Sequence, residues 1–413
     1  MRTLQLLSAA VLAAALAGCE PIAGSGGDEP LAKLPRPLTS SEQALIGASN
    51  QFAFGLLREA SRADTSSNVF LSPLSASMAL GMTMNGARGP TFEGMRSALG
   101  FGAMQPAEIN AAYRSLIDLL LGLDEGVDMR VANSIWVRRG FPLHDAFVQS
   151  SLQSFDAKVS TLDFADPAAV GTINTWVSQG TNGKITKLLE RIDPDMVMYL
   201  INAVYFKGNW TQQFDPKRTT ETPFMRADGR PLRVQMMHLP KAKIRLLESP
   251  DVQIADLAYG REAFSMTLLL PPRSQDLERW AGTITDAQWQ GWMGQMREAQ
   301  MDVYLPRFRL EYEQVLNGTL KALGMQTAFD DVAADFSGMS PLGADLFIDE
   351  VKQKTFLEVN EKGTEAAAAT SVGVGVTSLP PSFMADRPFM LVIRERLSGT
   401  ILFVGLIGAP PSA

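Results

Sequence analysis

The chain has 413 residues, 46% of them hydrophobic, which is enough apolar material for one large domain or two of medium size. Its net charge of -7, without long basic runs, argues against a surface that attracts nucleic acid. A single cysteine rules out intrachain disulfides and CxxC zinc clusters, and the two histidines lack HExxH spacing. We therefore expect no metal, no cofactor and no nucleic-acid partner.

Residues 1–18 have the pattern of an export signal. Arg2 is followed by an apolar run from Leu4 to Leu16, which is shorter than the ~20 residues of a membrane-spanning helix. The sequence Leu16-Ala17-Gly18-Cys19 resembles the lipobox of bacterial lipoproteins, in which the cysteine is lipidated and becomes the first mature residue. We expect an exported lipoprotein of the cell envelope, at the outer membrane by analogy, or an extracellular protein. The alternative is an ordinary signal peptide cut nearby, with Cys19 left free.

Residues 19–40 are rich in proline, glycine and acidic side chains, and such a segment cannot bury a core. We expect it to be a flexible tether. Neither a fixed-period repeat nor a second linker interrupts residues 41–413, so the sequence predicts a single domain there.

Helical signals come mainly in the first half of the chain. Ser40 and Gln43 form a capping-box pattern ahead of apolar residues at helical spacing. Ser72-Pro73 is a cap followed by a first-turn proline, and it predicts a helix that could continue to Gly86. Later, Val315–Leu323 reads as a helix stopped by a glycine.

Strand signals are spread through the whole chain. Apolar or alternating runs predict strands at Val131–Val137, Val197–Phe206, Phe264–Leu270 and Ile348–Val359. Near the end, Phe389–Ile393 and Ile401–Ile407 flank the turn signal Ser398-Gly399 and predict a buried hairpin. Helices in the first half with strands throughout indicate an α+β fold.

The sequence offers little support for an enzyme. No serine lies in a GxSxG elbow, Gly183-Lys184 lacks the upstream glycine of a phosphate-binding loop, and no GxGxxG opens a helix. Two histidines and one cysteine leave few nucleophile–base pairs. We therefore expect a protein that is not an enzyme.

The segment 361–381, EKGTEAAAATSVGVGVTSLPP, has no large side chain before Leu379. Every second residue from Thr364 to Val376 has a side chain that is small at first and branched and apolar later, whereas the residues between them are small or polar. Because side chains alternate between faces along a strand, the segment could become a strand with one buried face. The alternatives are a plain flexible linker and a short helix at Glu365–Ala369.

Several ordered motifs make the chain resemble the serpin family over essentially all of residues 41–413. The motifs are Asn68–Ser75, Asn85–Gly89, Ile173–Val177 with Thr181–Ile185, Ile201–Trp210, Val303–Phe308, Glu358–Ala367 and Phe383–Phe389. The resemblance implies three β-sheets, about nine helices and an exposed reactive loop near the carboxyl end. We call residues 363–379 the bait loop.

The resemblance also implies a suicide-type inhibitor of serine endopeptidases. A protease would cut the bait loop, which would insert into the large sheet and trap the acyl-enzyme in a covalent 1:1 complex. Counting from the hinge and from the closing motif gives the same reactive bond, Thr377–Ser378, with Val376 as the neighbouring alternative. The hinge that matches the inhibitory pattern comprises Glu361, Gly363, Thr364, Glu365, Ala366, Ala367, Ala368, Ala369 and Thr370.

The resemblance places a sheet-opening region at Ser72, Ser75, Asn202 and Gln353, with Trp210 close to where the loop would enter. Gln353 stands where the family often has histidine, and Arg387 replaces another frequent histidine. Gln353 can still donate and accept hydrogen bonds, but it cannot be protonated. These polar residues could equally be ordinary buried hydrogen-bonding groups.

A small branched bait residue suits a narrow apolar pocket, so an elastase-like or subtilisin-like target is expected and a trypsin-like one is not. The expected partners are that protease and a membrane reached through lipidated Cys19, and the protein is expected to be a monomer. Two alternatives stay open: a non-inhibitory serpin that acts as a binding or structural protein, and a cross-class inhibitor of cysteine proteases.

Overall fold

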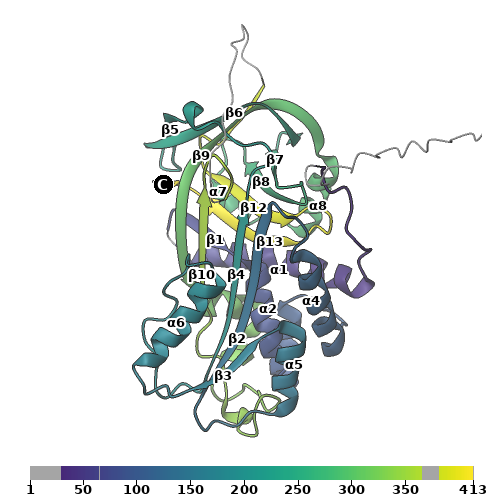
Figure 1. Cartoon of the computed structure of the whole chain (residues 1–413), viewed down its shortest axis with the longest axis vertical. Coiled ribbons are helices and arrows are strands. Elements are labelled where there is room, and N and C mark those ends of the chain that lie inside the picture. Colours follow the sequence, from purple (N-terminus) through teal and green to yellow (C-terminus); the bar gives the residue numbers. More distant parts are fainter. Residues whose placement is uncertain (1–28, 65, 365–380, 413) are drawn as a thin grey trace, which may run out of the picture.

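A computed structural model of the chain describes residues 29–64, 66–364 and 381–412 (Figure 1). The signal segment with Cys19, the hinge residues 365–370 and the bond Thr377–Ser378 lie outside these ranges. Glu361, Gly363 and Thr364 lie inside them.

The described residues form nine α-helices, six of which lie before residue 181, as the sequence predicted. The helices are α1 (Ser40–Ala63), α2 (Pro73–Met84), α3 (Gly89–Ala98), α4 (Pro106–Leu120), α5 (Asp145–Phe155), α6 (Ala168–Gly180), α7 (Leu277–Ala281), α8 (Asp286–Gln295) and α9 (Asn317–Leu320). None of these described helices has both the length and the apolar character that crossing a bilayer requires.

The cap residues explain where α1 and α2 begin. The capping box of α1 pairs Thr39 with Glu42, one residue earlier than the predicted Ser40 and Gln43. Ser72 caps α2 as predicted, since its hydroxyl accepts from the Ser75 amide. Because α2 is apolar around most of its circumference, it is buried in the middle of the molecule.

Strands occur along the whole described chain, as the sequence predicted. They are β1 (Asn68–Leu71), β2 (Val127–Arg138), β3 (Lys158–Leu162), β4 (Met198–Gly208), β5 (Thr220–Met225), β6 (Pro231–Glu248), β7 (Gln253–Tyr259), β8 (Phe264–Leu270), β9 (Arg297–Val315), β10 (Lys352–Val359), β11 (Ser382–Met384), β12 (Phe389–Glu395) and β13 (Ile401–Ile407). The predicted carboxyl-terminal hairpin is confirmed: every residue of β12 and β13 is buried.

Hydrogen bonds join the strands into a ten-stranded network and a three-stranded sheet, ordered β3-β2-β4. The long strand β9 belongs to two layers, because its first half pairs with β6 and its second half with β10. The α+β fold expected from the sequence is confirmed. In Figure 1, β4 and β10 run side by side down the long axis, with β2 and β3 beyond β4.

Two sequence-based expectations near the lower end were too simple. The predicted strand at Ile348–Val359 begins only at Lys352. The predicted helix at Val315–Leu323 is a short α9 followed by a π-type turn. The two errors share a cause, since the Leu316 amide donates to the Val351 carbonyl at 2.7 Å and the Val351 amide to Asn317 Oδ1 at 2.8 Å. These bonds hold both segments in irregular conformations.

The sheet separates two apolar clusters. The larger one lies between the sheets and the helices α1, α2 and α4. A smaller one under α6 includes Trp136, Ile173 and Ile201. On β4, Leu200 and Val204 therefore face the large core, and Ile201 faces α6.

Candidate functional site

The beginning of the bait loop is already hydrogen-bonded to the end of β4. The Trp210 amide donates to the Lys362 carbonyl at 2.8 Å, and the Thr364 amide donates to the Gly208 carbonyl at 2.7 Å. Asn209 and Gly363 form an antiparallel bridge. The chain turns back after β10 at this point and starts to run antiparallel to β4.

Gly363 is needed at this turn for two reasons. Its φ of 154° lies in a region that other residues rarely adopt, and an added Cβ would lie 2.0 Å from the Gly208 carbonyl oxygen. Backbone can therefore approach backbone closely here only with glycine at position 363.

Thr364 is buried, with 4% of its surface exposed. Its Oγ1 lies 2.8 Å from the Tyr259 hydroxyl, and burial raises the pKa of Tyr259 far above its ordinary value, so that hydroxyl stays protonated. The Tyr259 ring stacks on Trp210 with 4.4 Å between centroids, and Trp210 Nε1 donates to the Asn360 carbonyl at 2.9 Å. Aromatic packing thus supports Thr364 where it pairs with the end of β4.

Glu361 lies on the opposite side of the same turn and is also largely buried. It accepts a hydrogen bond from Thr219 Oγ1 at 2.8 Å, and Arg307 lies 3.7 Å from its carboxylate. Its carbonyl accepts from the Phe214 amide at 2.7 Å. These contacts fix the base from which the bait loop departs.

Below the hinge, β4 and β10 have facing edges, and no strand of the described residues lies between them. On its far edge β4 pairs with β2, and on its far edge β10 pairs with β9; no pairing joins β4 to β10 among the described residues. A cavity of about 160 Å³ opens between them, with α2 as its floor. We call this space the slot. Two unpaired strand edges at one gap form a template for a further strand.

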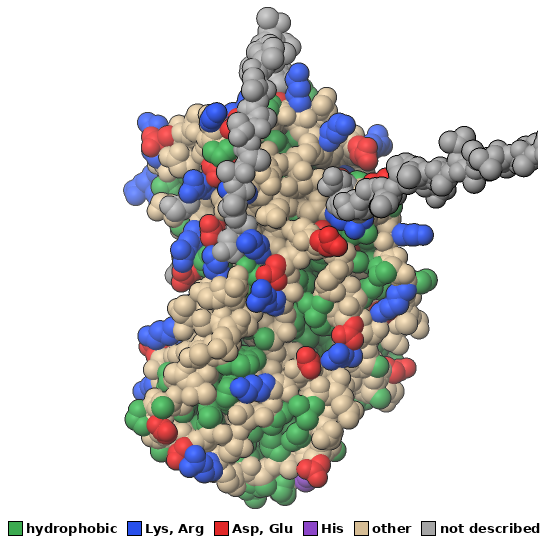
Figure 2. Space-filling model, viewed as in Figure 1, with side chains coloured by type: hydrophobic (Ala, Val, Ile, Leu, Met, Phe, Trp, Pro, Cys, Tyr) green, Lys and Arg blue, Asp and Glu red, His purple; other side chains and the backbone are tan. Residues whose placement is uncertain are grey.

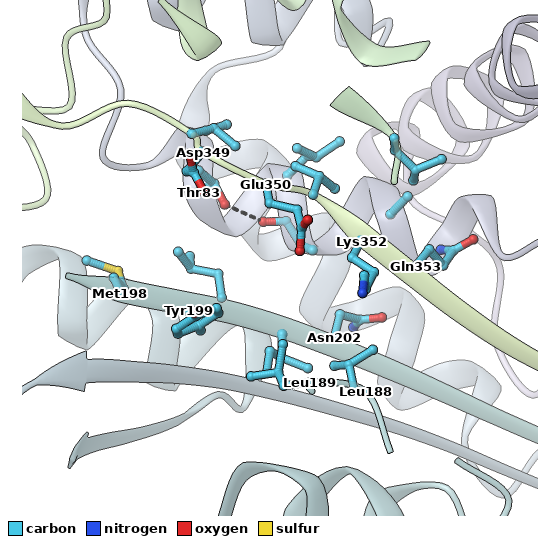
Figure 3. A pocket seen from close by; sticks show the side chains of 18 of the residues that line it. Thr83, Leu188, Leu189, Met198, Tyr199, Asn202, Asp349, Glu350, Lys352 and Gln353 are labelled. Carbon is cyan, nitrogen blue, oxygen red and sulfur yellow. Dashed lines mark hydrogen bonds between the residues drawn. The ribbon is translucent and has the colours of Figure 1, made fainter. Parts of the chain in front are cut away.

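Figure 3 shows the slot from close by: Asn202 and Tyr199 reach it from β4, and Lys352 and Gln353 from β10. Leu188, Leu189 and Met198 line its lower part. Asp349 and Glu350, which precede β10, also line the slot, so its lower part combines apolar side chains with carboxylates.

The polar residues predicted for sheet opening form two pairs under the slot. Ser75 Oγ hydrogen-bonds Asn202 Oδ1, and Asn202 Nδ2 donates to Asn133 Oδ1 at 2.5 Å. Gln353 accepts from the Ser72 amide and donates to the Ser72 carbonyl, both at 2.9 Å. Each amide side chain therefore links a strand beside the slot to a neighbouring element, α2 or β2 for Asn202 and the cap of α2 for Gln353.

Trp210, the fifth predicted residue of this set, lies at the other end of the slot beside the hinge. Sequence reasoning missed Tyr259 and Asn133, which contact the site from β7 and β2. Neither carries a local sequence signal, because only the packing of distant strands brings them to Thr364 and Asn202.

Comparison with known proteins agrees with this geometry. Residues 47–410 match the family model described as "Serpin (serine protease inhibitor)". Human Serpin B11 is 32% identical over 391 residues, covering 89% of this chain and 100% of its own length. Iripin-4 of Ixodes ricinus is 38% identical, with 89% and 95% covered, and a serpin-like protein of Thermococcus kodakarensis is 35% identical, with 89% and 86% covered.

Two solved structures resemble the chain over nearly its whole length. The thermophilic serpin tengpin in its native state has a TM-score of 0.81 at 29% identity, covering 93% of this chain and 97% of tengpin. Human thyroxine-binding globulin, complexed with its hormone, has a TM-score of 0.82 at 27% identity, with 90% and 100% covered. From its motifs, its fold and these relatives, we conclude that the chain belongs to the serpin family.

Proposed function

We propose that this serpin is a suicide-type inhibitor of serine endopeptidases that uses the bond Thr377–Ser378 as bait. After attack and acyl-enzyme formation, the cut loop inserts into the slot between β4 and β10 and carries the protease with it. The observation that carries the proposal is the hinge: Gly363 and Thr364 already pair with the end of β4, directly above the slot.

The pairing at the hinge defines a register for insertion. Antiparallel pairing that continues from Gly363–Asn209 would bring Thr370 opposite Asn202, Val372 opposite Leu200 and Val374 opposite Met198. Directly paired residues share a face, and Leu200 and Met198 face the large core. The branched side chains of the bait loop would therefore face the large core, and the small or polar ones would face α6.

The energetics favour insertion. A strand of roughly 13 residues between two unpaired edges gains two rows of backbone hydrogen bonds, and at ~0.5–1.5 kcal/mol net for each bond this releases on the order of 10 kcal/mol. The uncut molecule is then kinetically trapped, as is usual for proteins that store strain for a switch.

Thr377 at the bait position favours a target with a narrow apolar pocket, such as an elastase-like or subtilisin-like protease. We also propose that residues 1–18 direct export and that a lipid on Cys19 anchors the monomeric protein in the cell envelope. The alternative at this step is a secreted protein with Cys19 unmodified.

The deciding experiment mixes the mature protein with an elastase-like serine protease and separates the products on a denaturing gel. A covalent band at the summed mass supports trapping. Rapid cleavage after Thr377 without that band would instead favour the non-inhibitory reading, and a band formed only with a cysteine protease would favour cross-class inhibition. Mass spectrometry of the mature amino terminus tests the lipid on Cys19.

A further inference from the structure

Residues 29–38 belong to the segment predicted as a tether, yet they contact the folded domain. They run along its flank to the start of α1 and appear in Figure 1 as the darkest purple stretch. Leu31 and Leu38 pack against the large apolar core. Two anchoring points hold this segment, which we call the clasp.

The first anchoring point is the turn after β7. The Leu31 amide donates to the Arg261 carbonyl at 2.7 Å, and Arg261 Nε donates back to the Glu29 carbonyl at 3.0 Å. The turn itself is fixed, because the Arg261 amide donates to Asp124 Oδ2 at 2.8 Å. Gly260, at φ 51°, approaches the same carboxylate so closely that an added Cβ would lie 2.4 Å from Asp124 Oδ1. The acceptor for Leu31 is therefore held in place by the domain.

The second anchoring point is an ion pair at the start of α1. Arg36 donates to both carboxylate oxygens of Glu42, at 2.9 and 2.6 Å. Arg36 also donates to the Ser115 carbonyl at 3.1 Å and the Ser115 hydroxyl at 2.8 Å, which ties the clasp to α4. The Glu42 side chain is fully buried, and its hydrogen bonds with Arg36 lower its pKa to about 2. A bidentate pair with a buried carboxylate is a geometrically specific contact.

The clasp changes how far the domain can lie from an anchor at Cys19. Residues 20–28 can span at most about 32 Å when fully extended, whereas residues 20–38 could span about 66 Å. With the clasp closed, the distance available to the domain is thus about half of what the whole tether would allow.

We propose that residues 29–38 act as a clasp that shortens the tether and holds the bait loop in a thin layer above the membrane, so that the partner is a protease attached to the same bilayer. This inference rests on the proposed lipid anchor and inhibitory function. A short tether favours partners confined to the same surface, because both molecules then share a small volume and meet at a high effective concentration.

The clasp is tested first in solution, with the full mature chain and hydrogen exchange. Arg36→Ala removes the ion pair, and Leu31→Pro removes the amide that donates to Arg261. The matched control is Lys33→Ala, because Lys33 is an exposed residue of the same segment. We expect the Leu31 amide, which donates to Arg261, to exchange at least about tenfold faster in Arg36→Ala and to be unchanged in Lys33→Ala. Leu31→Pro has no amide at this position and is followed by the energy transfer described next. Equally fast exchange in the parent and in Arg36→Ala would overturn the clasp.

The reach is tested on vesicles with the lipidated protein. A donor dye on Val332→Cys, at a position that is 88% exposed, reports its height above acceptor-labelled lipid through energy transfer. We expect Arg36→Ala and Leu31→Pro to lose transfer relative to the parent and to Lys33→Ala. We also expect both variants to trap a vesicle-anchored elastase-like protease more slowly, while a soluble form of that protease is trapped at the parent rate.

These readouts separate the inference from the proposals beneath it. If mass spectrometry finds no lipid on Cys19, the membrane-proximal layer is refuted together with the anchor, whereas the exchange result still decides the clasp. If neither protease form is trapped, inhibition fails, and the energy transfer still decides the reach. Unchanged transfer in both clasp variants of the lipidated protein would refute the shortened tether.

Discussion

The replacement Thr364→Arg tests insertion at its first step. Thr364 is buried, its amide pairs with Gly208, and its hydroxyl pairs with Tyr259 at 2.8 Å. Arginine cannot keep its charge beside the stacked Tyr259 and Trp210 without a large desolvation cost. The variant therefore loses the paired start of the inserted strand.

The size of the effect can be worked out from these contacts. An unpartnered buried Tyr259 hydroxyl and one lost backbone bond cost together about 3 kcal/mol, before any cost of the arginine charge. In the uncut variant the hinge can unpair and leave the arginine in solvent, so this cost falls on the insertion step, which slows by roughly 150-fold. Deacylation of the protease then competes with insertion, so we expect the variant to be cleaved as a substrate.

The assay titrates an active-site-calibrated elastase-like protease with the parent and with Thr364→Arg, and measures the moles of serpin consumed per mole of enzyme inhibited. Thr364→Ser is the matched control, since it keeps the hydroxyl that faces Tyr259. We expect the ratio to rise more than tenfold for Thr364→Arg and to change little for Thr364→Ser. A parent-like ratio for the arginine variant would refute insertion from this hinge.

Three further outcomes follow from the same contacts. Cleavage in the bait loop should raise the melting temperature by about 13 °C, which is the ~10 kcal/mol gained on insertion divided by the unfolding entropy of a domain of this length. Scanning calorimetry measures this shift, and the absence of a rise would contradict insertion. Gln353→Leu leaves the Ser72 amide and carbonyl without their side-chain partner, so we expect a melting temperature about 3 °C lower than that of the parent. Gln353→Glu should recover only the hydrogen bond that the Ser72 amide donates. Arg36→Ala should lower stability near pH 7 by about 1 kcal/mol in urea titrations, a value reduced for solvent screening because Arg36 is 39% exposed. The pKa of Glu42 is lowered from 4.5 to about 2, so the stabilisation by the ion pair is complete above pH 4.5 and is lost as the pH falls toward 2. If the difference in unfolding free energy between the parent and Arg36→Ala persisted at pH 2, that result would count against the ion pair.

The sequence alone was sufficient for the fold class. Apolar runs predicted the terminal hairpin, and the Ser72-Pro73 pair predicted the start of α2, because these signals act within a few residues of the chain. The segment 348–351 was misread for the opposite reason: its backbone bonds to residues 316 and 317, far from it in the sequence. Local pattern carries no information about such a partner.

Contacts with residues far away in the sequence also determine the conformation of the amino-terminal segment. Its composition indicates a tether, yet the ion pair from Arg36 to the buried Glu42 and Ser115 fixes residues 29–38 on the domain. Composition measures how little apolar surface a segment can bury, but it does not register one bidentate contact with a folded partner.

For the bait loop, the sequence and the tertiary structure supply different kinds of information. Its alternation of small and branched side chains predicts that it could become a strand with one buried face, because a strand has a period of two whatever surrounds it. The place that we propose for such a strand could come only from the tertiary structure. The facing edges of β4 and β10, the Gly208 carbonyl close to Gly363 and the Tyr259 hydroxyl beside Thr364 are contributed by elements far apart in the chain.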